Sequence, residues 1–501
     1  MIQNEPMIRR LDMIHCTLCG NAPCDAACDK LDPAGLLRSI WLRNEQGAVS
    51  RLPQDNPCAA CTAPCERACV RPGQVPIRAL INRLYTEVKP EAETSVPADE
   101  SRLRCELCGI PLENPFLLSS SVVASTYDMC ARAFEAGWAG ISFKTICSLV
   151  IHEASPRYSA ITGSANTIVG FKNIEQLSPH TVAEDMEIFR RLKANYPSKF
   201  ILASIMGSDE VEWGELARQC EENGADALEL NFSCPNMVED GLGSDIGQVP
   251  DLVERYTAAA KSACNIPVLA KLTPNVATMN PAAVAALRGG ADGIAAINTI
   301  KSVVGLNIHT FVSSPSVHGH SAVGGYSGNA VKPIALRFIT ELAQNPMLSD
   351  MHLSAMGGVE TWQDALEYLL LGGQSIQVTT AVMQYGYRII DDLKEGLNLY
   401  LAEKGVDNVS QIVGLGLSGL GETTDDLERD TIMFPRFIRD RCIGCGRCEI
   451  SCSDGGHQAI HLNDQRRPVL NGRRCVGCHL CVLVCPQRAI VPSGKRVVPK
   501  R

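Results

Sequence analysis

Short apolar runs alternate with amphipathic stretches through the middle of the chain, between residues 102 and 405. Apolar positions recur at helical spacing between the runs, as in 211–223, 250–263 and 281–288. The runs predict strands at Phe116–Ser121, Gly140–Ile146, Phe200–Met206, Ala227–Cys234, Pro267–Thr273, Gly293–Thr299, His352–Gly358 and Ser375–Val382. Eight strands with intervening helices predict an α/β fold, a (β/α)8 TIM barrel at 102–405. A doubly wound sheet is the alternative, but eight regular units favour closure.

The pattern changes on both sides of this region. Residues 1–90 are rich in cysteine and contain a helical stretch at 33–48, which predicts a small α-helical domain. Residues 91–101 are acidic and lack apolar periodicity, so we expect a linker there. Residues 406–501 carry a second cysteine-rich block and form the expected C-terminal domain.

Composition and charge exclude several classes of protein. The chain is 45% hydrophobic and 20% charged, which is typical of a globular protein. Its net charge of −9, without a long basic run, argues against nucleic acid as a partner. No apolar run approaches the roughly 20 residues that cross a bilayer, and the N-terminus lacks the layout of a signal peptide. We therefore expect a cytoplasmic protein that binds neither nucleic acid nor membranes.

Cysteine is clustered at both ends of the chain. Of the 23 cysteines, eight precede residue 70 and eight follow residue 441, which indicates metal binding rather than disulfides. The C-terminal eight form a doubled Cys-x2-Cys-x2-Cys-x3-Cys ferredoxin motif, in which the fourth cysteine of each run ligates the other cluster. The predicted ligands of two [4Fe-4S] clusters are Cys442, Cys445, Cys448 and Cys485 for one, and Cys475, Cys478, Cys481 and Cys452 for the other.

The N-terminal cysteines form two more sets of four. The first is Cys16, Cys19, Cys24 and Cys28, and the second is Cys58, Cys61, Cys65 and Cys69. Zinc is the alternative occupant, because paired Cys-x2-Cys elements hold zinc in many small domains. Four cysteines that lie close together, twice, favour two further [4Fe-4S] clusters. For the second set, the choice between iron–sulfur and zinc stays open.

Polar residues follow nearly every predicted strand of the barrel, at the end where such folds carry out their chemistry. Glycine pairs and threonines after the seventh and eighth strands are typical of a phosphate site, and another glycine-rich loop is expected at 324–328. Together with two strand-end lysines, these features indicate a phosphorylated cofactor with an electron-accepting ring. The strand-end residues are Ser119, Ser120, Lys144, Thr145, Asn231, Ser233, Cys234, Lys271, Asn298, Thr299, Gly357, Gly358, Thr379 and Thr380.

Several of these positions lie in motifs that resemble a known family. The motifs are Asn114-Pro115-Phe116, Phe143-Lys144-Thr145, Phe171-Lys172-Asn173-Ile174-Glu175, Asn231-Phe232-Ser233-Cys234-Pro235 and Gly325-Tyr326-Ser327-Gly328. Their order and spacing resemble the FMN domain of the dihydropyrimidine dehydrogenases, within the wider group of dihydroorotate dehydrogenases. The likeness is greatest to the bacterial NAD-dependent type, whose subunit carries FMN and two clusters. The N-terminal block is similar to the iron–sulfur domain of the glutamate synthase small subunit, where clusters share ligands between cysteine sets, so the assignment of each cysteine stays open.

The resemblance implies roles for individual residues. FMN would be held by Ser119, Ser120, Lys144, Thr145, Asn173, Lys271, Ser327, Gly328, Gly357, Gly358, Thr379 and Thr380. A pyrimidine would be held by Asn173, Glu175, Asn231, Ser233, Asn298 and Thr299, with Cys234 as the proton donor. Asparagine amides both donate and accept, which suits a ring of alternating N–H and C=O groups. A thiol with an ordinary pKa is mostly protonated at neutral pH, and the loop at 236–247 is expected to be a mobile cover.

The implied reaction is reduction of uracil or thymine to the 5,6-dihydropyrimidine, and its reverse. Hydride would pass from FMN N5 to C6, and Cys234 would protonate C5. Because the chain has no recognisable NAD or FAD fingerprint, and no G-x-G-x-x-G follows a strand in its N-terminal region, we expect a separate FAD-containing NAD(P)H oxidoreductase subunit in a hetero-oligomer. The alternatives are a dihydroorotate dehydrogenase, a reductase of another cyclic amide and an electron-relay subunit. Glu175 argues against orotate, whose carboxylate it would repel.

Overall fold

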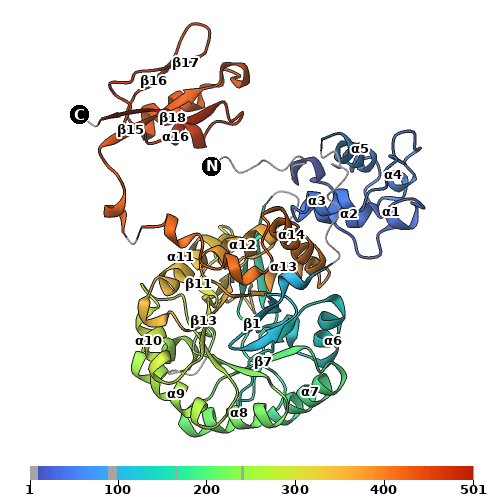
Figure 1. Ribbon diagram of the computed structural model, residues 1–501, viewed down its shortest axis with the longest axis vertical. Coiled ribbons are helices and arrows are strands. Elements are labelled where there is room, and N and C mark those ends of the chain that lie inside the picture. The colour runs from blue at the N-terminus through green and yellow to red at the C-terminus, as the bar shows by residue number, and fades with distance from the viewer. Residues whose placement is uncertain (1–9, 88–98, 164–166, 238–241, 422, 500–501) are drawn as a thin grey trace. The chain divides into compact units, whose positions relative to one another are not determined.

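The structure is a computed structural model that describes residues 10–87, 99–163, 167–237, 242–421 and 423–499. It divides into two compact units, Met1–Ser418 and Gly419–Arg501 (Figure 1). The first unit contains the N-terminal helices and the barrel, and the second contains the C-terminal cysteines. None of the described helices is long and apolar enough to cross a membrane.

Eight parallel strands close into a barrel, which confirms the predicted fold and excludes a doubly wound sheet. Their order around the barrel is β10-β13-β14-β3-β4-β7-β8-β9. The bounds are β3 Phe116–Leu118, β4 Gly140–Ser142, β7 Phe200–Ile205, β8 Ala227–Asn231, β9 Val268–Lys271, β10 Gly293–Ala296, β13 His352–Met356 and β14 Ser375–Val378. Every residue of these strands is buried, because the barrel interior covers one face and the surrounding helices cover the other.

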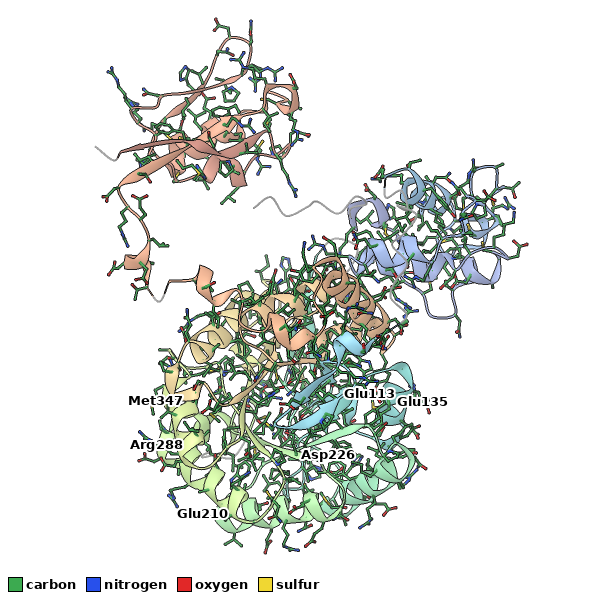
Figure 2. The ribbon with its side chains drawn as sticks, in the orientation of Figure 1. Glu113, Glu135, Glu210, Asp226, Arg288 and Met347 are labelled. Atoms are coloured by element: carbon green, nitrogen blue, oxygen red, sulfur yellow. The ribbon has the colours of Figure 1, made fainter. Side chains whose placement is uncertain are left out.

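Helices surround the barrel (Figure 1). They are α6 Tyr127–Ala136, α7 Val182–Asn195, α8 Glu210–Glu222, α9 Pro250–Ser262, α10 Asn280–Arg288, α11 Lys332–Ala343, α12 Trp362–Leu370, α13 Thr380–Tyr385 and α14 Ile389–Glu403. Charged side chains such as Glu210 of α8 and Arg288 of α10 lie on the outside of this ring (Figure 2). The N-terminal end of the barrel packs against a hairpin of β1 Cys105–Leu107 and β2 Ile110–Leu112, through Leu107 and Leu112.

A second sheet, with strand order β11-β12-β6-β5, stands apart from the barrel strands. Its strands are β5 Tyr158–Thr162, β6 Ile168–Asn173, β11 Ile300–Ser302 and β12 Gly324–Ser327. The expectation of a loop at 324–328 is therefore wrong, since most of this segment is a strand paired with β6. A Cβ atom on Gly325 would lie 2.2 Å from Thr299 Oγ1, so glycine here permits close packing of the strand rather than a turn.

The N-terminal domain is helical, as predicted, with α1 Pro23–Ala26, α2 Pro33–Trp41, α3 Glu45–Ser50, α4 Pro64–Ala68 and α5 Ile77–Glu87. The single helix expected at 33–48 is two helices instead. Arg43 has a positive φ of 62°, and the Asn44 side chain accepts a hydrogen bond from Gly47 N at 3.2 Å. Asn44 thereby caps α3, a conformation that competes with continuation of α2.

Helix α14 attaches the N-terminal domain to the barrel through a buried carboxylate. Asp392 is 1% exposed and accepts hydrogen bonds from Arg38 Nε at 2.7 Å, Asn44 Nδ2 at 3.3 Å and the Ser39 hydroxyl. Nearby, Trp41 Nε1 donates to the Tyr385 hydroxyl at 3.2 Å. A charge that accepts several hydrogen bonds is well compensated despite its burial. The contacts therefore tie α2 to the two helices that follow the last barrel strand.

The ends of the barrel domain differ from the expected boundaries. The expected linker lies mostly outside the described residues, and its described end contacts the barrel, where Asn398 Nδ2 donates to Asp99 O at 3.1 Å. At the other end, Val409 and Ile412 are buried in the barrel's core, and the first unit continues to Ser418. Hydrophobic contacts thus extend the barrel unit beyond residue 405.

The C-terminal unit is a small α/β domain. It contains β15 Thr431–Phe437, α15 Arg447–Gly455, β16 Ile460–Leu462, β17 Pro468–Leu470, α16 Leu480–Leu483 and β18 Ile490–Pro499. Strand β18 pairs with β15 in antiparallel register, from Phe437↔Ile490 to Thr431↔Pro499. The basic end of the chain is therefore largely a strand.

Candidate functional site

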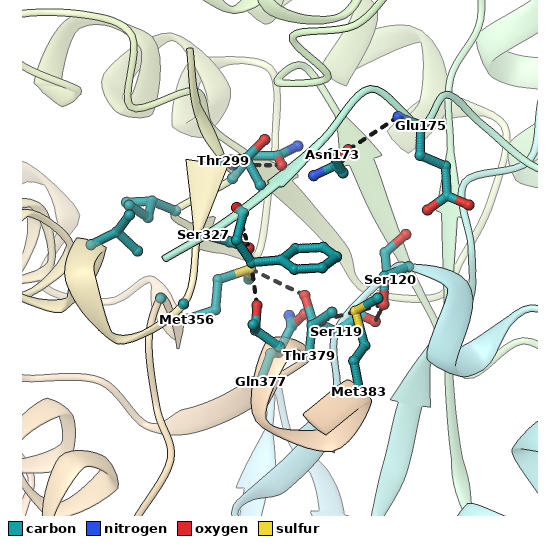
Figure 3. A pocket seen from close by; sticks show the side chains of 18 of the residues that line it. Ser119, Ser120, Asn173, Glu175, Thr299, Ser327, Met356, Gln377, Thr379 and Met383 are labelled. Carbon is teal, nitrogen blue, oxygen red and sulfur yellow. Dashed lines mark hydrogen bonds between the residues drawn. The ribbon is translucent and has the colours of Figure 1, made fainter. Parts of the chain in front are cut away.

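A cavity of about 1140 Å³ lies among the C-terminal ends of the barrel strands and the nearby sheet (Figure 3). Strand register brings its parts together: Asn231 of β8 is paired with Lys271 of β9, and Ser119 N donates to Val378 O at 3.1 Å. All predicted flavin and pyrimidine residues except Ser233 line it. They are Ser119, Ser120, Lys144, Thr145, Asn173, Glu175, Asn231, Cys234, Lys271, Asn298, Thr299, Ser327, Gly328, Gly357, Gly358, Thr379 and Thr380.

Ser233 lies behind the cavity wall and is fully buried. Its hydroxyl donates to Asn231 Oδ1 at 2.8 Å and accepts from Asn298 Nδ2 at 2.8 Å. Asn231 Nδ2 in turn donates to Thr145 Oγ1 at 2.8 Å. Because these bonds define which end of each amide is oxygen and which is nitrogen, Ser233 positions the two asparagines. A direct contact between Ser233 and a ligand, which the sequence predicted, is not supported by this geometry.

Cys234 lines the cavity and is only 6% exposed. Burial, with a smaller contribution from nearby Glu153, raises the pKa of its thiol to about 11, although Asn236 N and the lysines Lys144 and Lys271 oppose the rise. The thiol therefore stays protonated at neutral pH. The predicted mobile cover includes residues 238–241, which lie outside the described residues.

The lysine at the end of β4 is paired with carboxylates. Lys144 Nζ lies 3.0 Å from Glu175 Oε1 and 3.7 Å from Glu153 Oε1. Arg157 Nε lies 3.6 Å from the same Glu175 oxygen. Asn236 connects this group to the neighbouring strand, because its Nδ2 donates to Asn173 Oδ1 at 3.1 Å and to Glu175 O at 2.8 Å. The predicted flavin lysine and the predicted pyrimidine carboxylate are thus direct neighbours.

The second lysine belongs to a buried polar network at the floor of the cavity. Glu229 is fully buried and accepts from Lys271 Nζ at 3.0 Å, from Ser142 Oγ at 3.0 Å and from Gln377 Nε2 at 3.0 Å. Gln377 Nε2 also donates to Ser354 Oγ at 3.0 Å. Since a carboxylate can only accept, Glu229 determines that the amide nitrogen of Gln377 faces it. The other amide atom, Gln377 Oε1, is buried without a partner among the described residues.

Sequence reasoning missed Gln377 and Asn236, which both line the cavity (Figure 3 labels Gln377). Asn236 Oδ1 is likewise buried without a partner in the described part of the chain. An unpaired buried acceptor costs stability unless a ligand or water donates to it. A polar residue between the apolar Ile376 and Val378 of a buried strand was the available signal for Gln377. Asn236 directly follows the Cys234-Pro235 pair and could have been included with that motif.

The opposite part of the cavity is formed by close backbone contacts. Gly328, Gly357 and Gly358 have positive φ of 89°, 132° and 74°. A Cβ atom on Gly358 would lie 2.7 Å from Gly328 O, so a larger residue would close the space between the two loops. Ser327 Oγ and Thr380 Oγ1 lie 2.9 Å apart at the same place. Glycine backbone and hydroxyl groups of this kind suit a phosphate.

The C-terminal unit contains two further cavities, each lined by four cysteines. Cys442, Cys445, Cys448 and Cys485 line one of about 400 Å³, and Cys452, Cys475, Cys478 and Cys481 line one of about 360 Å³. These are the two sets predicted from the doubled motif. Backbone N–H groups already point at two of the sulfurs, with Ala489 N donating to Cys485 Sγ at 3.2 Å and Ala459 N to Cys452 Sγ at 3.3 Å.

The N-terminal thiols group across the two sequence sets. Burial raises the pKa of Cys24 to about 12, and the nearby Cys16 and Cys69 add to the rise. Burial raises the pKa of Cys58 to about 11, with Cys61, Cys65 and Cys28 as neighbours. The fourth cysteine of each set therefore lies with the other set. Across the described ranges, no three Cys, His, Asp or Glu side chains are placed to hold a single metal ion.

Comparison with known proteins agrees with this architecture. Residues 102–401 match the dihydroorotate dehydrogenase family, and residues 436–491 match a 4Fe-4S dicluster domain. The chain therefore belongs to the dihydroorotate dehydrogenase family, a family of oxidoreductases, and carries a C-terminal iron–sulfur domain. The parasite Eimeria tenella provides a solved dihydroorotate dehydrogenase with the same fold, at a TM-score of 0.53 and 17% identity over 64% of this chain and 90% of that one.

Individual relatives within the family are more specific. The chain is 50% identical over 385 residues to the NAD-dependent dihydropyrimidine dehydrogenase subunit PreA of Escherichia coli K12, covering 77% of this chain and 93% of that protein. It is 36% identical to the chloroplastic NADP-dependent dihydropyrimidine dehydrogenase of Arabidopsis thaliana, over 67% of this chain and 82% of that protein. It is 38% identical to the catalytic subunit of Pyrococcus abyssi dihydroorotate dehydrogenase B, over 63% of this chain and 99% of that protein.

Proposed function

We propose that this chain reduces uracil or thymine to the 5,6-dihydropyrimidine, and catalyses the reverse reaction, as the catalytic subunit of a dihydropyrimidine dehydrogenase. The observation that best supports this function is that a protonated, buried Cys234 lies in the same cavity as Asn173, Asn231 and Asn298. This set combines an acid with amides that can match both the N–H and the C=O groups of a pyrimidine ring. The identity to a named dihydropyrimidine dehydrogenase subunit supports the same activity.

The residues of the cavity fit FMN. In one part of the cavity, glycines with positive φ and hydroxyl groups could bind the phosphate of FMN. At the floor, Lys271 and Gln377 could bind its polar ring. The unpartnered Gln377 Oε1 supplies an acceptor that a ring N–H would satisfy. FMN bound here would supply hydride chemistry that amino-acid side chains lack.

The protein's own contribution is to bind, orient and protonate the substrate. Cys234 Sγ would give its proton to C5 of the pyrimidine, and its raised pKa keeps that proton on the thiol at neutral pH. Asn231 and Asn298 are held by Ser233, so their donor and acceptor ends are already oriented. Glu175, balanced by Lys144 and Arg157, would accept a ring N–H. Such preorganisation lowers the cost of ordering these groups when substrate binds.

Electrons would reach the cavity through four [4Fe-4S] clusters. The two in the C-terminal unit would use the cysteine sets that line its cavities. In the N-terminal domain we assign Cys16, Cys19, Cys24 and Cys69 to one cluster, and Cys28, Cys58, Cys61 and Cys65 to the other, because these thiols are electrostatic neighbours. The electron source would be a separate FAD-containing NAD(P)H oxidoreductase subunit in a cytoplasmic hetero-oligomer.

Anaerobic turnover tests the proposal. The holoprotein is supplied with reduced methyl viologen and with uracil, thymine or orotate in separate reactions. We expect both uracil and thymine to be reduced, and Cys234→Ala to abolish reduction while cluster and flavin spectra stay unchanged. Reduction of orotate alone would instead support a dihydroorotate dehydrogenase. Unchanged turnover in Cys234→Ala would support a relay subunit whose barrel does not carry out the chemistry.

A further inference from the structure

The C-terminal unit carries a charge opposite to that of the whole chain. Residues 436–491 contain nine arginines, no lysine and four carboxylates, a formal charge of +5 when the cysteines are counted as neutral, whereas the whole chain counted in the same way carries −9. All nine arginines are exposed. Such a concentration of one sign produces a field that extends well beyond the surface and attracts oppositely charged molecules.

Three of these arginines line one groove beside a cluster site. The groove has a volume of about 1120 Å³ and is lined by Arg436, Arg439 and Arg467, and the described residues of its wall include no carboxylate. Cys442 lines both this groove and the cavity of the first predicted cluster. A molecule in the groove would therefore be separated from the cluster only by a cluster ligand.

The arginines of the groove have no anionic partner among the described residues. Arg467 donates to a backbone oxygen, that of Cys442, and neither Arg436 nor Arg439 forms an ion pair there. In the wall of the groove itself, the apolar side chain of Val469 is 38% exposed. An exposed apolar side chain near unpaired arginines has the composition of a protein interface, where arginine is enriched.

We propose that this groove, defined by Arg436, Arg439 and Arg467, is the docking surface for the acidic face of an electron-donating protein. The inference rests on the proposed function and adds a second electron source to it, a dissociating one-electron carrier that would act beside the FAD-containing subunit. Each encounter with a reduced one-electron carrier would oxidise the carrier by one electron and reduce the cluster beside Cys442 by one. Two encounters would supply the two electrons that one pyrimidine takes up together with two protons.

An acidic partner fits better than a neutral one for a physical reason. Charge complementarity raises association rate constants from about 10⁵–10⁶ M⁻¹s⁻¹ toward 10⁸–10⁹ M⁻¹s⁻¹ at low salt. A brief, fast encounter suits an electron carrier, which must dissociate after each transfer. The arginines could instead only offset the negative charge of the clusters, and in that case they would change cluster potentials but not association.

The test compares two electron donors of opposite charge on the holoprotein. The donors are a photoreduced acidic plant-type ferredoxin and the methyl viologen radical cation, and cluster bleaching is followed by stopped-flow absorbance. The groove variant is Arg436→Glu/Arg439→Glu. The matched control is Arg473→Glu/Arg474→Glu, which makes the same charge change at exposed arginines outside the groove.

We expect the groove variant to slow reduction by ferredoxin at least tenfold at low salt, and the control pair to slow it several times less. Raising the ionic strength from 0.01 to 0.1 M, which shortens the Debye length from about 30 to about 10 Å, should slow the wild type and affect the groove variant much less. Reduction by the methyl viologen cation, and pyrimidine turnover driven by it, should not be slowed. That last result separates the two ideas, since viologen-driven turnover depends on the proposed function and not on docking.

Three results would overturn the docking proposal. Equal slowing by both variants would show that net charge matters and the groove does not. Slowing of both donors in the groove variant, together with shifted cluster potentials, would show that the arginines only offset cluster charge. Salt-sensitive self-association that the groove variant abolishes, with ferredoxin reduction unaffected, would show that a second copy of this chain is the occupant.

Discussion

Removing the carboxylate beneath the cavity should destabilise the barrel strongly. In Glu229→Leu, Lys271 would lose the anion that lies 3.0 Å from its ammonium group, and Gln377 and Ser142 would lose their acceptor. Both members of the pair are almost fully buried, so solvent cannot replace the lost partner. Breaking a buried ion pair by removing one member costs about 3–5 kcal/mol. We therefore expect the FMN-free variant to be less stable than wild type by an amount in this range.

The assay is urea unfolding of the FMN-free protein, followed by circular dichroism and by tryptophan fluorescence. With an m-value of about 3 kcal/mol/M, the midpoint of the barrel transition should fall by roughly 1–2 M. Glu229→Leu/Lys271→Met removes both charges and should recover much of the loss, because no unpaired charge remains. A loss below about 1 kcal/mol in the single variant, or a double variant that is less stable than the sum of the singles, would refute the reasoning.

The remaining predictions concern a thiol, a histidine and the attachment of the N-terminal domain. With its pKa raised to about 11, Cys234 should keep pyrimidine reduction level up to about pH 9 and lose it as the pH approaches 11, whereas a decline near pH 8.5 in the pH–rate profile would contradict the assignment. Burial lowers the pKa of His352 to about 4, so its neutral form stabilises the fold above pH 6.5, and about 2 kcal/mol should be lost between pH 7 and pH 5. Urea midpoints at the two pH values should show this loss in wild type and not in His352→Gln. Asp392→Ala should loosen helix α2 from the barrel at a cost of about 3 kcal/mol or more, measured by faster hydrogen exchange in α2, with Asp391→Ala as an exposed control. Unchanged exchange in α2 would show that other contacts hold the domain.

The sequence predicted well those features that depend on local pattern. Apolar runs and helical spacing identified all eight barrel strands, and closure then required their C-terminal ends to meet at one rim. For that reason Lys144, Asn231, Cys234 and Lys271 could be grouped before their distances were known. The doubled cysteine motif likewise predicted two cluster sites. In this motif the fourth cysteine of each run always ligates the cluster of the other run, so the two ligand sets follow from the sequence alone.

Tertiary structure alone decided the features that depend on residues far apart in the sequence. The side chain of Ser233 points away from the cavity and bonds to Asn231 instead. The side chain of Gln377 lines the cavity, and Glu229, on another strand, orients its amide. The segment at Gly324 is a strand rather than a loop because β6 lies beside it and leaves no space for a side chain. Local propensity cannot encode such contacts, since each requires chain closure to bring two distant segments together. The sequence by itself therefore determined the barrel, the cluster motifs and the rim of the site, and the fold decided which polar atoms face the ligand.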